Sequence, residues 1–310
     1  MSFAFIFPGQ GSQSVGMLSE LAAQFPLVGE TFQEASSALG YDLWQLVKDG
    51  PAEDLNQTHI TQPAMLTAGI AAWRVWQEQN GAQPAAMAGH SLGEYTALVA
   101  AGSLDLGEAV SLVADRGRFM QEAVPAGTGA MAAILGLDDA KVIEVCEQAA
   151  EGEVVSAVNF NSPGQVVVAG HAKAVDRAVE LAKAAGAKRA LVLPVSVPSH
   201  CSLMAPAAER LAERLAGIQV NTPAVPVYNN VDVKAENDAA AIRDALKRQL
   251  YSPVRWVETI QALAGQGIGT VVECGPGKVL VGLNKRIDKA MGTQFIQDPD
   301  SLAAALEAVK

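Results

Sequence analysis

The feature that most constrains this chain is a serine set between two glycines, in the pentapeptide G-H-S-L-G at residues 89–93. A serine at the tip of a strand-to-helix turn holds its hydroxyl clear of the sheet. The glycines two positions away on either side allow the close backbone approach that this turn needs. A chain with 28 glycines can contain such a pentapeptide by chance. Ser91 is therefore a candidate nucleophile only if a buried strand precedes it and a helix follows it.

The segments around Ser91 meet this condition. The run PAAMAG at 84–89 is apolar and has the length of a short strand. The run LGEYTALVAAG at 92–102 is rich in helix formers and ends on Gly102. An earlier helix is predicted over 63–79, with Pro63 in its first turn. The order strand, serine, helix favours an α/β fold with a parallel sheet.

Composition excludes several other classes of protein. The chain has 310 residues, of which 50% are hydrophobic, so it is long enough for one elaborate domain or two. Its net charge of −11 argues against binding to nucleic acid or to an anionic membrane. No apolar run reaches the ~18 residues of a membrane span, and none at the start has the pattern of a signal peptide. Three scattered cysteines predict a reduced, cytoplasmic protein with no zinc cluster.

The order of the predicted strands and helices changes after residue 128 and indicates a second structural unit within the chain. From Gly129 to Ser196, strand-like and helix-like segments alternate in the order βαββαβ, which is the split βαβ order of a ferredoxin-like module. We therefore expect a ferredoxin-like subdomain over 128–197. It would be inserted into a larger domain made of residues 1–127 and 198–310.

A predicted helix over 105–124 carries an arginine on its apolar face. Arg116 lies at helical spacing from Leu112 and Val113, whereas Asp115 and Arg118 lie on the outward face. A buried guanidinium cannot lose its proton, so it requires an anion. An internal Asp or Glu is the simpler candidate, and a bound ligand is the other.

A serine nucleophile needs an adjacent base, which is most often a histidine. His200, in VPSHC, follows a strand predicted over 187–196. In open α/β sheets, active-site residues are common just after the carboxyl ends of strands. The alternative for His200 is a surface loop. His59 is predicted in a loop before the helix at 63–79, His171 at the start of a helix that it caps, and His90 pointing away from its neighbour Ser91.

Two glycine-rich loops do not fit nucleotide sites. FPGQGSQ at 7–13 has Ser14 where a dinucleotide fingerprint needs its third glycine. GPGK at 275–278 has Val272 and Val279 where a P-loop needs a glycine and a hydroxyl residue. The first loop could instead supply a backbone N–H to an oxyanion hole, together with the N–H that follows the serine.

Taken together, these motifs resemble the malonyl-CoA:acyl carrier protein transacylases of fatty-acid synthesis, in their stand-alone bacterial form. The resemblance spans essentially the whole chain. It is carried by FPGQGSQ, TQPA, GHSLGEY, ADRGRFMQ, NFNSPGQ, VPSHCSLM, YNN and ECGPGKVL, in that order.

The resemblance implies a role for each candidate residue. Ser91 is the nucleophile that becomes malonylated, and His200 is its base. The N–H groups of Gln10 and Leu92 form the oxyanion hole. Arg116 binds the malonyl carboxylate, and the main-chain carbonyl of Gln249 orients the histidine in place of a triad acid. The implied fold is an α/β-hydrolase-like domain with a ferredoxin-like insert.

The resemblance also implies the partners, which are malonyl-CoA and the phosphopantetheinylated acyl carrier protein, with no further cofactor and no metal. An acidic carrier would need a basic patch on this acidic chain, for which the candidates are Lys188, Arg189, Lys278, Lys285 and Arg286. Three other functions stay open. They are a thioesterase, in which water takes the acyl group, a discrete acyltransferase of a polyketide pathway, and a non-catalytic module that binds carrier protein.

Overall fold

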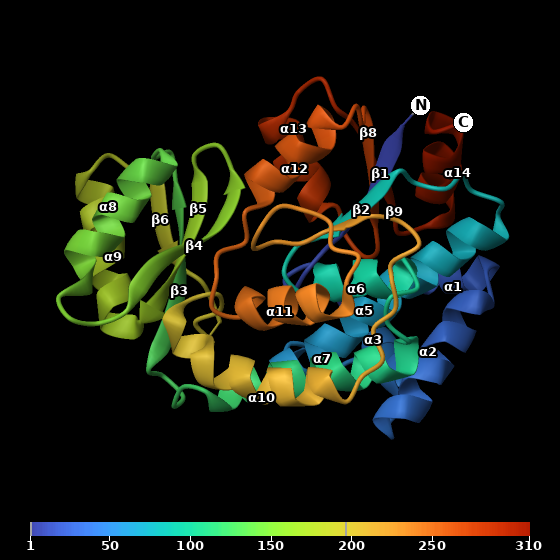
Figure 1. Ribbon diagram of the computed structural model, residues 1–310, viewed down its shortest axis with the longest axis horizontal. Helices are drawn as coiled ribbons and strands as arrows, with labels where there is room; N and C mark the ends of the chain where they lie inside the picture. The colour runs from blue at the N-terminus through green and yellow to red at the C-terminus, as the bar shows by residue number, and fades with distance from the viewer. Residues whose placement is uncertain (1, 196) are drawn as a thin grey trace.

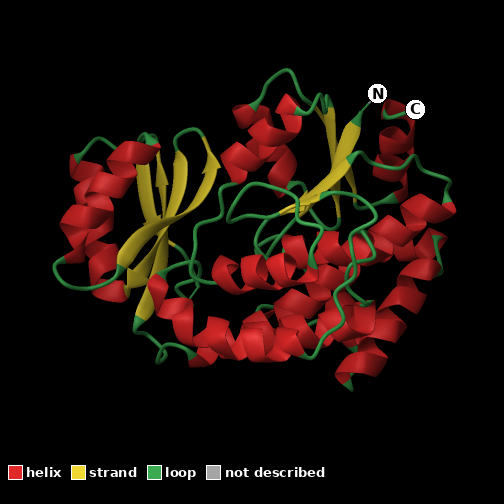
Figure 2. Ribbon diagram, in the orientation of Figure 1, coloured by secondary structure: helices red, strands yellow, loops and turns green. Residues whose placement is uncertain are grey.

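The computed structural model describes residues 2–195 and 197–310, which form two sheets with helices packed around each (Figures 1 and 2). The larger sheet is parallel throughout, with strand order β7-β2-β1-β8-β9. Its strands are β1 (Phe3–Phe7), β2 (Ala86–Gly89), β7 (Val227–Tyr228), β8 (Thr270–Cys274) and β9 (Gly292–Ile296).

Helices cover both faces of the parallel sheet, as its strongly apolar central strand requires. On β1, Phe3, Phe5 and Phe7 point into the larger hydrophobic core, while Ala4 and Ile6 point into a second core on the opposite face. The larger core contains residues of α1 (Ser19–Gln24), α2 (Leu27–Leu39), α5 (Thr58–Glu78), α6 (Gly93–Ala100), α7 (Leu106–Glu122), α10 (Ala205–Ala216), α11 (Ala239–Gln249) and α14 (Pro299–Ala308). The opposite core is closed by α12 (Trp256–Gly265) and α13 (Val279–Ile287). Between α2 and α5 lie the short α3 (Leu43–Asp49) and α4 (Ala52–Leu55), and a 3₁₀ turn, Ser202–Met204, precedes α10.

The smaller sheet lies to one side of the molecule, at the left of Figure 1, and is antiparallel with order β4-β5-β3-β6. Its elements are β3 (Gly129–Leu135), α8 (Asp139–Ala150), β4 (Val155–Ser162), β5 (Gln165–His171), α9 (Ala172–Ala184) and β6 (Arg189–Val192). Helices α8 and α9 share one apolar core with this sheet. Backbone hydrogen bonds join β4 to the segment before α12, from Phe160 N to Val254 O at 3.0 Å and from Val254 N to Val158 O at 2.8 Å.

Several elements differ from the sequence predictions. Helix α5 begins at Thr58 instead of Pro63, so the proline lies inside the helix and His59 lies in its first turn, not in a loop. The β-branched residues of this turn have low helix propensity, but Thr58 and Thr61 are buried, and tertiary packing overrides the propensity. The strand predicted over 187–196 ends at Val192, and its last residue, Ser196, lies outside the described residues.

Among the described residues, no helix is both long and apolar enough to cross a bilayer.

Candidate active site

The turn after β2 brings Ser91 to the carboxyl edge of the parallel sheet. Ser91 has a φ of 51°, in the left-handed region that residues with a Cβ rarely adopt. A Cβ on Gly89 would lie 1.8 Å from the carbonyl carbon of Gly93, and a Cβ on Gly93 would lie 2.1 Å from Phe7 O. Both positions therefore require glycine, for the reason that the pentapeptide suggested.

Asn230, two positions after the neighbouring strand β7, anchors this turn. The Ser91 N–H donates to Asn230 Oδ1 at 2.7 Å, and Asn230 Nδ2 donates to Gly89 O at 2.7 Å. One buried amide thus bonds to the backbone on both sides of the turn, which offsets part of the strain at Ser91.

His200 approaches the serine from a loop far along the chain. Its Nε2 lies 2.7 Å from Ser91 Oγ, and its Nδ1 lies 2.8 Å from the main-chain oxygen of Gln249. A carbonyl only accepts hydrogen bonds, so Nδ1 carries the hydrogen and Nε2 accepts from the serine hydroxyl. Burial and the charge of Arg116 lower the pKa of His200 to about 3, which keeps the imidazole neutral and able to take a proton.

The structure places His200 beside Ser91, but the strand from which the sequence argued does not hold it there. Strand β6, which precedes it, belongs to the small antiparallel sheet, and β6 ends eight positions before His200. The histidine is held instead by the segment that follows α11, because its N–H donates to Leu250 O at 3.0 Å.

Arg116 is buried beside the reacting hydroxyl, with only 1% of its surface exposed. Its Nη2 donates to Ser91 Oγ at 3.3 Å and to Gln249 Oε1 at 3.0 Å, and its Nη1 donates to Gln62 Oε1 at 2.8 Å. Within the described part of the chain, no carboxylate lies within 4.0 Å of this guanidinium. The internal Asp or Glu considered from the sequence is therefore not in direct contact with it.

Gln249 connects the groups around the serine. Its side-chain oxygen accepts from Arg116, and its Nε2 donates to Ser91 O at 3.0 Å and to Glu94 Oε2 at 2.8 Å. Its main-chain oxygen accepts from His200. One residue thus contacts the serine segment, the histidine and the arginine at once.

The loop after β1 lies against the serine turn. A Cβ on Gly9 would lie 2.6 Å from His90 O, so this glycine permits close contact between the two loops. Gln10 is exposed, and its side chain reaches Thr58 Oγ1 at 3.5 Å. Among the hydrogen bonds of residues 2–195 and 197–310, none uses the N–H of Gln10 or of Leu92 as donor. Both N–H groups remain available to a ligand.

The other histidines have partners elsewhere. His90 Nε2 lies 2.8 Å from Asn161 Oδ1 on β4, and His59 Nδ1 lies 3.0 Å from Gln121 Oε1. His171 occupies the position before α9 but does not cap that helix with its side chain, because its Nδ1 accepts from Val154 N. Beside the histidine loop, burial raises the pKa of Cys201 to about 11, so its thiol is a poor nucleophile.

Comparison with known proteins agrees with this geometry. The model of the acyl transferase domain family matches residues 4–298. The chain belongs to the acyl transferase family. This acyl transferase is 64% identical over 304 residues to the malonyl CoA-acyl carrier protein transacylase of Salmonella typhimurium, with 98% of each chain covered. The resemblance inferred from the motifs is confirmed.

Solved structures of similar proteins share the fold of this acyl transferase. The malonyl CoA-acyl carrier protein transacylase of Coxiella burnetii matches with a TM-score of 0.98 at 56% identity, covering 99% of this chain and 97% of that one. A malonyl-transacylase solved in complex with a holo type II PKS acyl-carrier protein matches with a TM-score of 0.98 at 58% identity, covering 99% of this chain and 100% of that one. The expected α/β fold, with a parallel and an antiparallel sheet, is confirmed.

Three polar residues of the acyl transferase site had no role assigned from the sequence. Asn230, Glu94 and Gln62 are all buried and lie within the motifs YNN, GHSLGEY and TQPA. The available signal was a polar residue within an otherwise buried motif, which requires hydrogen-bond partners. Such a pattern indicates a hydrogen-bond network but does not identify the partner of each residue.

Among the described residues there is no group of His, Cys, Asp and Glu side chains that could hold a metal ion.

Proposed function

We propose that this chain transfers a malonyl group from malonyl-CoA to the phosphopantetheine thiol of an acyl carrier protein, through a malonyl ester on Ser91. The observation that carries the proposal is the buried guanidinium of Arg116, 3.3 Å from Ser91 Oγ and bonded to two amide oxygens. A cation held beside a nucleophile favours an acyl group that ends in a carboxylate, because each then has its counter-charge in a desolvated site.

In the first half of the reaction His200 takes the proton of Ser91, and the serine oxygen attacks the thioester carbon of malonyl-CoA. The N–H groups of Gln10 and Leu92 bind the oxyanion, and each such donor lowers the barrier by about 3 kcal/mol. The carbon–sulfur bond breaks, His200 returns the proton to the sulfur, and CoA leaves. In the second half the carrier's thiol attacks the malonyl ester by the same steps in reverse.

Arg116 gives selectivity in two ways. Its bidentate pair with the malonyl carboxylate orients the acyl group. An acyl group without a free carboxylate, such as acetyl, leaves the guanidinium unpaired. The charge of Arg116 also lowers the pKa of His200. A malonyl carboxylate neutralises that charge and makes the histidine a stronger base, whereas an acetyl group does not.

This selectivity is tested by replacing Arg116 with Ala and comparing malonyl-CoA with acetyl-CoA. We expect the preference for malonyl-CoA to be lost while some acyl transfer remains, since Ser91 and His200 are unchanged. An unchanged preference for malonyl-CoA would remove Arg116 from this role.

For the fold, we propose that residues 1–127 and 198–310 form an α/β-hydrolase-like catalytic domain and residues 128–197 a ferredoxin-like insert. The support is the order of the four antiparallel strands, in which the first strand lies between the third and the fourth, with both helices on one face. The absence of a cofactor and a cytoplasmic location stay predictions.

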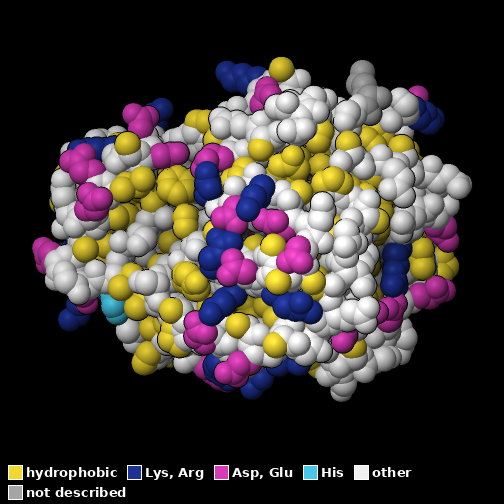
Figure 3. Space-filling model, in the orientation of Figure 1, with side chains coloured by type: hydrophobic (Ala, Val, Ile, Leu, Met, Phe, Trp, Pro, Cys, Tyr) yellow, Lys and Arg dark blue, Asp and Glu magenta, His cyan; other side chains and the backbone are white. Residues whose placement is uncertain are grey.

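The carrier protein is proposed to dock on the basic residues Lys188, Arg189, Lys278, Lys285 and Arg286, all of which are exposed. Arg286 Nη1 donates to Gln165 Oε1 at 2.8 Å, which joins α13 to β5. The face in Figure 3 carries acidic and basic side chains side by side. A basic patch must therefore attract the acidic carrier protein although acidic side chains lie near it. Changing Lys285 and Arg286 to Glu should raise the KM for the carrier far more than the KM for malonyl-CoA; equal effects would refute the patch.

A polyketide carrier protein is a second candidate partner. The observation that favours it is the 58% identity with the malonyl-transacylase solved with a type II PKS carrier. The decisive experiment supplies malonyl-CoA with fatty-acid carrier, with polyketide carrier or with no carrier, and follows malonyl-carrier and free malonate by mass. Malonyl-carrier as main product supports the proposal, and the better carrier identifies the pathway. Free malonate formed equally fast without carrier would support a thioesterase instead.

A further inference from the structure

Glu94 is a buried carboxylate that the reaction described above does not use. It lies on α6 three positions after Ser91 and is 2% exposed. Its Oε2 accepts two hydrogen bonds, from Asn230 N at 2.9 Å and from Gln249 Nε2 at 2.8 Å. Both donors belong to residues that also bond to the serine turn. A carboxylate kept out of water at this position carries a large desolvation cost and needs a compensating interaction.

The side chain of Gln249 links this carboxylate to Arg116. The amide nitrogen donates to Glu94 Oε2 and the amide oxygen accepts from Arg116 Nη2 at 3.0 Å. The positive end of the amide dipole therefore faces the anion and the negative end faces the cation. In this orientation the amide stabilises both charges, although they do not touch. The attraction between Glu94 and Arg116 also stabilises each charged form.

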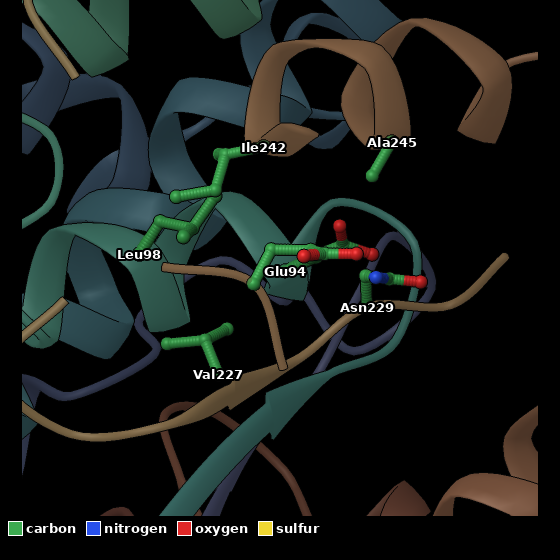
Figure 4. A pocket seen from close by; sticks show the side chains of 7 residues that line it. Glu94, Leu98, Val227, Asn229, Ile242 and Ala245 are labelled. Atoms are coloured by element: carbon green, nitrogen blue, oxygen red, sulfur yellow. The ribbon is translucent and has the colours of Figure 1, made fainter. Parts of the chain in front are cut away.

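A small cavity of about 10 Å³ lies beside Glu94 (Figure 4). It is lined by Glu94, Leu98, Val227, Asn229, Glu236, Ile242 and Ala245. Its volume suits about one water molecule. Glu236, which also lines the cavity, is partly exposed and pairs with Lys234 at 2.7 Å. The cavity thus gives Glu94 a short route for a proton from solvent.

We propose that Glu94 is the counter-charge of Arg116 in the substrate-free enzyme, acting through the side-chain amide of Gln249, and that it takes up a proton when a malonyl carboxylate pairs with Arg116. The inference rests on the proposed malonyl transfer. The proton comes from solvent and adds to the Glu94 carboxylate; no bond of the substrate changes in this step. Glu94 is a positioning residue, since it reaches the acyl group only through Gln249 and Arg116.

The charges around Glu94 are compatible with such a titration. Burial raises the pKa of Glu94 to about 7, while Arg116 and the bonds from Asn230 and Gln249 act in the opposite direction. Asp232 repels it but is itself paired with Arg248 at 2.7 Å. The remaining groups near it are Glu236, which lines the same cavity, and the phenol of Tyr95, whose pKa burial raises to about 12. His200 stays neutral, with its pKa at about 3, so Glu94 is the group of this network that titrates near neutral pH.

The sign of the effect follows from the charges. Above pH 7 Glu94 is ionised in the free enzyme and competes with the malonyl carboxylate for Arg116. Below pH 7 it is protonated and this competition is absent. The KM for malonyl-CoA should therefore rise with pH, by about tenfold for each unit by which malonyl binding raises the pKa of Glu94. Loading with acetyl-CoA should show no such change.

The test is the variant Glu94→Gln, which keeps an oxygen that accepts both hydrogen bonds and removes the charge. We expect its KM for malonyl-CoA to stay at the low-pH value across the pH range, while the pH dependence of acetyl-CoA loading stays as in the wild type. Glu236→Gln, which removes a charge from the same cavity, should behave like the wild type. Combining Glu94→Gln with Arg116→Ala should abolish the effect of the Glu94 change. A second measurement needs no variant: malonylation of the wild type above pH 7 should take up protons from a weakly buffered solution.

Three results would overturn the inference. They are a Glu94→Gln enzyme with the wild-type pH dependence, equal effects on malonyl-CoA and acetyl-CoA, and malonylation of the wild type without proton uptake. In each of these the malonyl transfer itself survives. If the wild type forms no malonyl ester at any pH, the proposed function fails as well, and the two failures are thereby distinguished.

Discussion

The serine turn and the histidine loop meet at 2.7 Å, but they are held in opposite ways. The turn is fixed mainly by its own neighbours, because β2, α6 and the end of β1 pack so closely that only glycine fits at positions 89 and 93. The described residues of the histidine loop also bond locally, from Ser199 N to Val197 O and from Cys201 Sγ to Pro198 O, but these bonds do not involve the histidine side chain. Its histidine is held by Gln249 O and Leu250 O, about fifty positions further along the chain. Both residues have a strained backbone conformation, with φ of 51° at Ser91 and 66° at His200.

Ser91 and His200 are therefore positioned by different kinds of contact. The conformation of the serine turn is set by a short motif, because the turn, strand and helix are contiguous, and Asn230 then anchors it from a distant segment. The base needs a contact between distant segments, so it depends on the fold being complete.

Replacing His200 with Ala should lower acyl transfer by about 10⁴-fold or more, because the serine loses its base while its position is unchanged. Steady-state transfer to the carrier protein measures the loss. His171→Ala is the matched control, since His171 lies on the small sheet and bonds to Val154 N. A drop no larger than that of the control would show that another group serves as base.

Gly93→Ala should disrupt the turn itself. The new Cβ would lie 2.1 Å from Phe7 O, a backbone atom that cannot move aside cheaply, so the free energy of unfolding should fall by about 3 kcal/mol. Urea denaturation measures it. The control is Gly29→Ala, within α2, where a Cβ meets nothing within 4 Å and stability should rise by about 0.5–1 kcal/mol. Equal effects at the two glycines would contradict the local account of the turn.

Gln249→Met separates the two functions of Gln249. The main-chain oxygen that holds His200 is retained, while Arg116 loses a hydrogen-bond acceptor. We expect kcat/KM for malonyl-CoA to fall about tenfold, the usual effect of removing a hydrogen bond to a charged group, with acetyl-CoA loading nearly unchanged. Gln148→Met, on the exposed surface of α8, is the control. If acetyl-CoA loading falls equally, the side chain also supports the histidine loop.

The pH profile of acetyl-CoA loading should be almost flat through the range in which histidines usually titrate. Because the pKa of His200 is lowered from 6.5 to about 3, its imidazole remains neutral as the pH falls through 6.5, and kcat/KM should not decline there. Acetyl-CoA is the suitable substrate, since it does not engage Arg116 and so avoids the proposed titration of Glu94. A decline centred near pH 6.5 would mean that His200 is exposed to water in the working enzyme.

The sequence predicted those parts of the site whose cause is local. Ser91 follows from its pentapeptide between a strand and a helix, and the burial of Arg116 follows from helical spacing in α7. The anchoring of the turn by Asn230 could not be predicted, because the two segments are 139 positions apart and only the strand order brings them together. The same holds for Glu94 and Gln249, at a separation of 155.

Fold predictions failed where packing overrides local preference. The first turn of α5 contains Thr58, Ile60 and Thr61, whose β-branched side chains disfavour a helix, yet the buried threonines hold it in place. Strand β7 is short and contains only Val227 and Tyr228. Beyond these residues the N–H of Asn230 donates to Glu94 Oε2 and its side-chain amide donates to Gly89 O, so this segment bonds to the site.

The most direct test of the central claim is the intact mass of the protein after mixing with malonyl-CoA, with acetyl-CoA and with Ser91→Ala in parallel. We predict one malonyl adduct on the wild type, little acetyl adduct, none on Ser91→Ala, and loss of the malonyl adduct when carrier protein is added. A malonyl adduct that persists on Ser91→Ala, or wild-type protein that releases CoA without any adduct, would contradict transfer through a malonyl ester on Ser91.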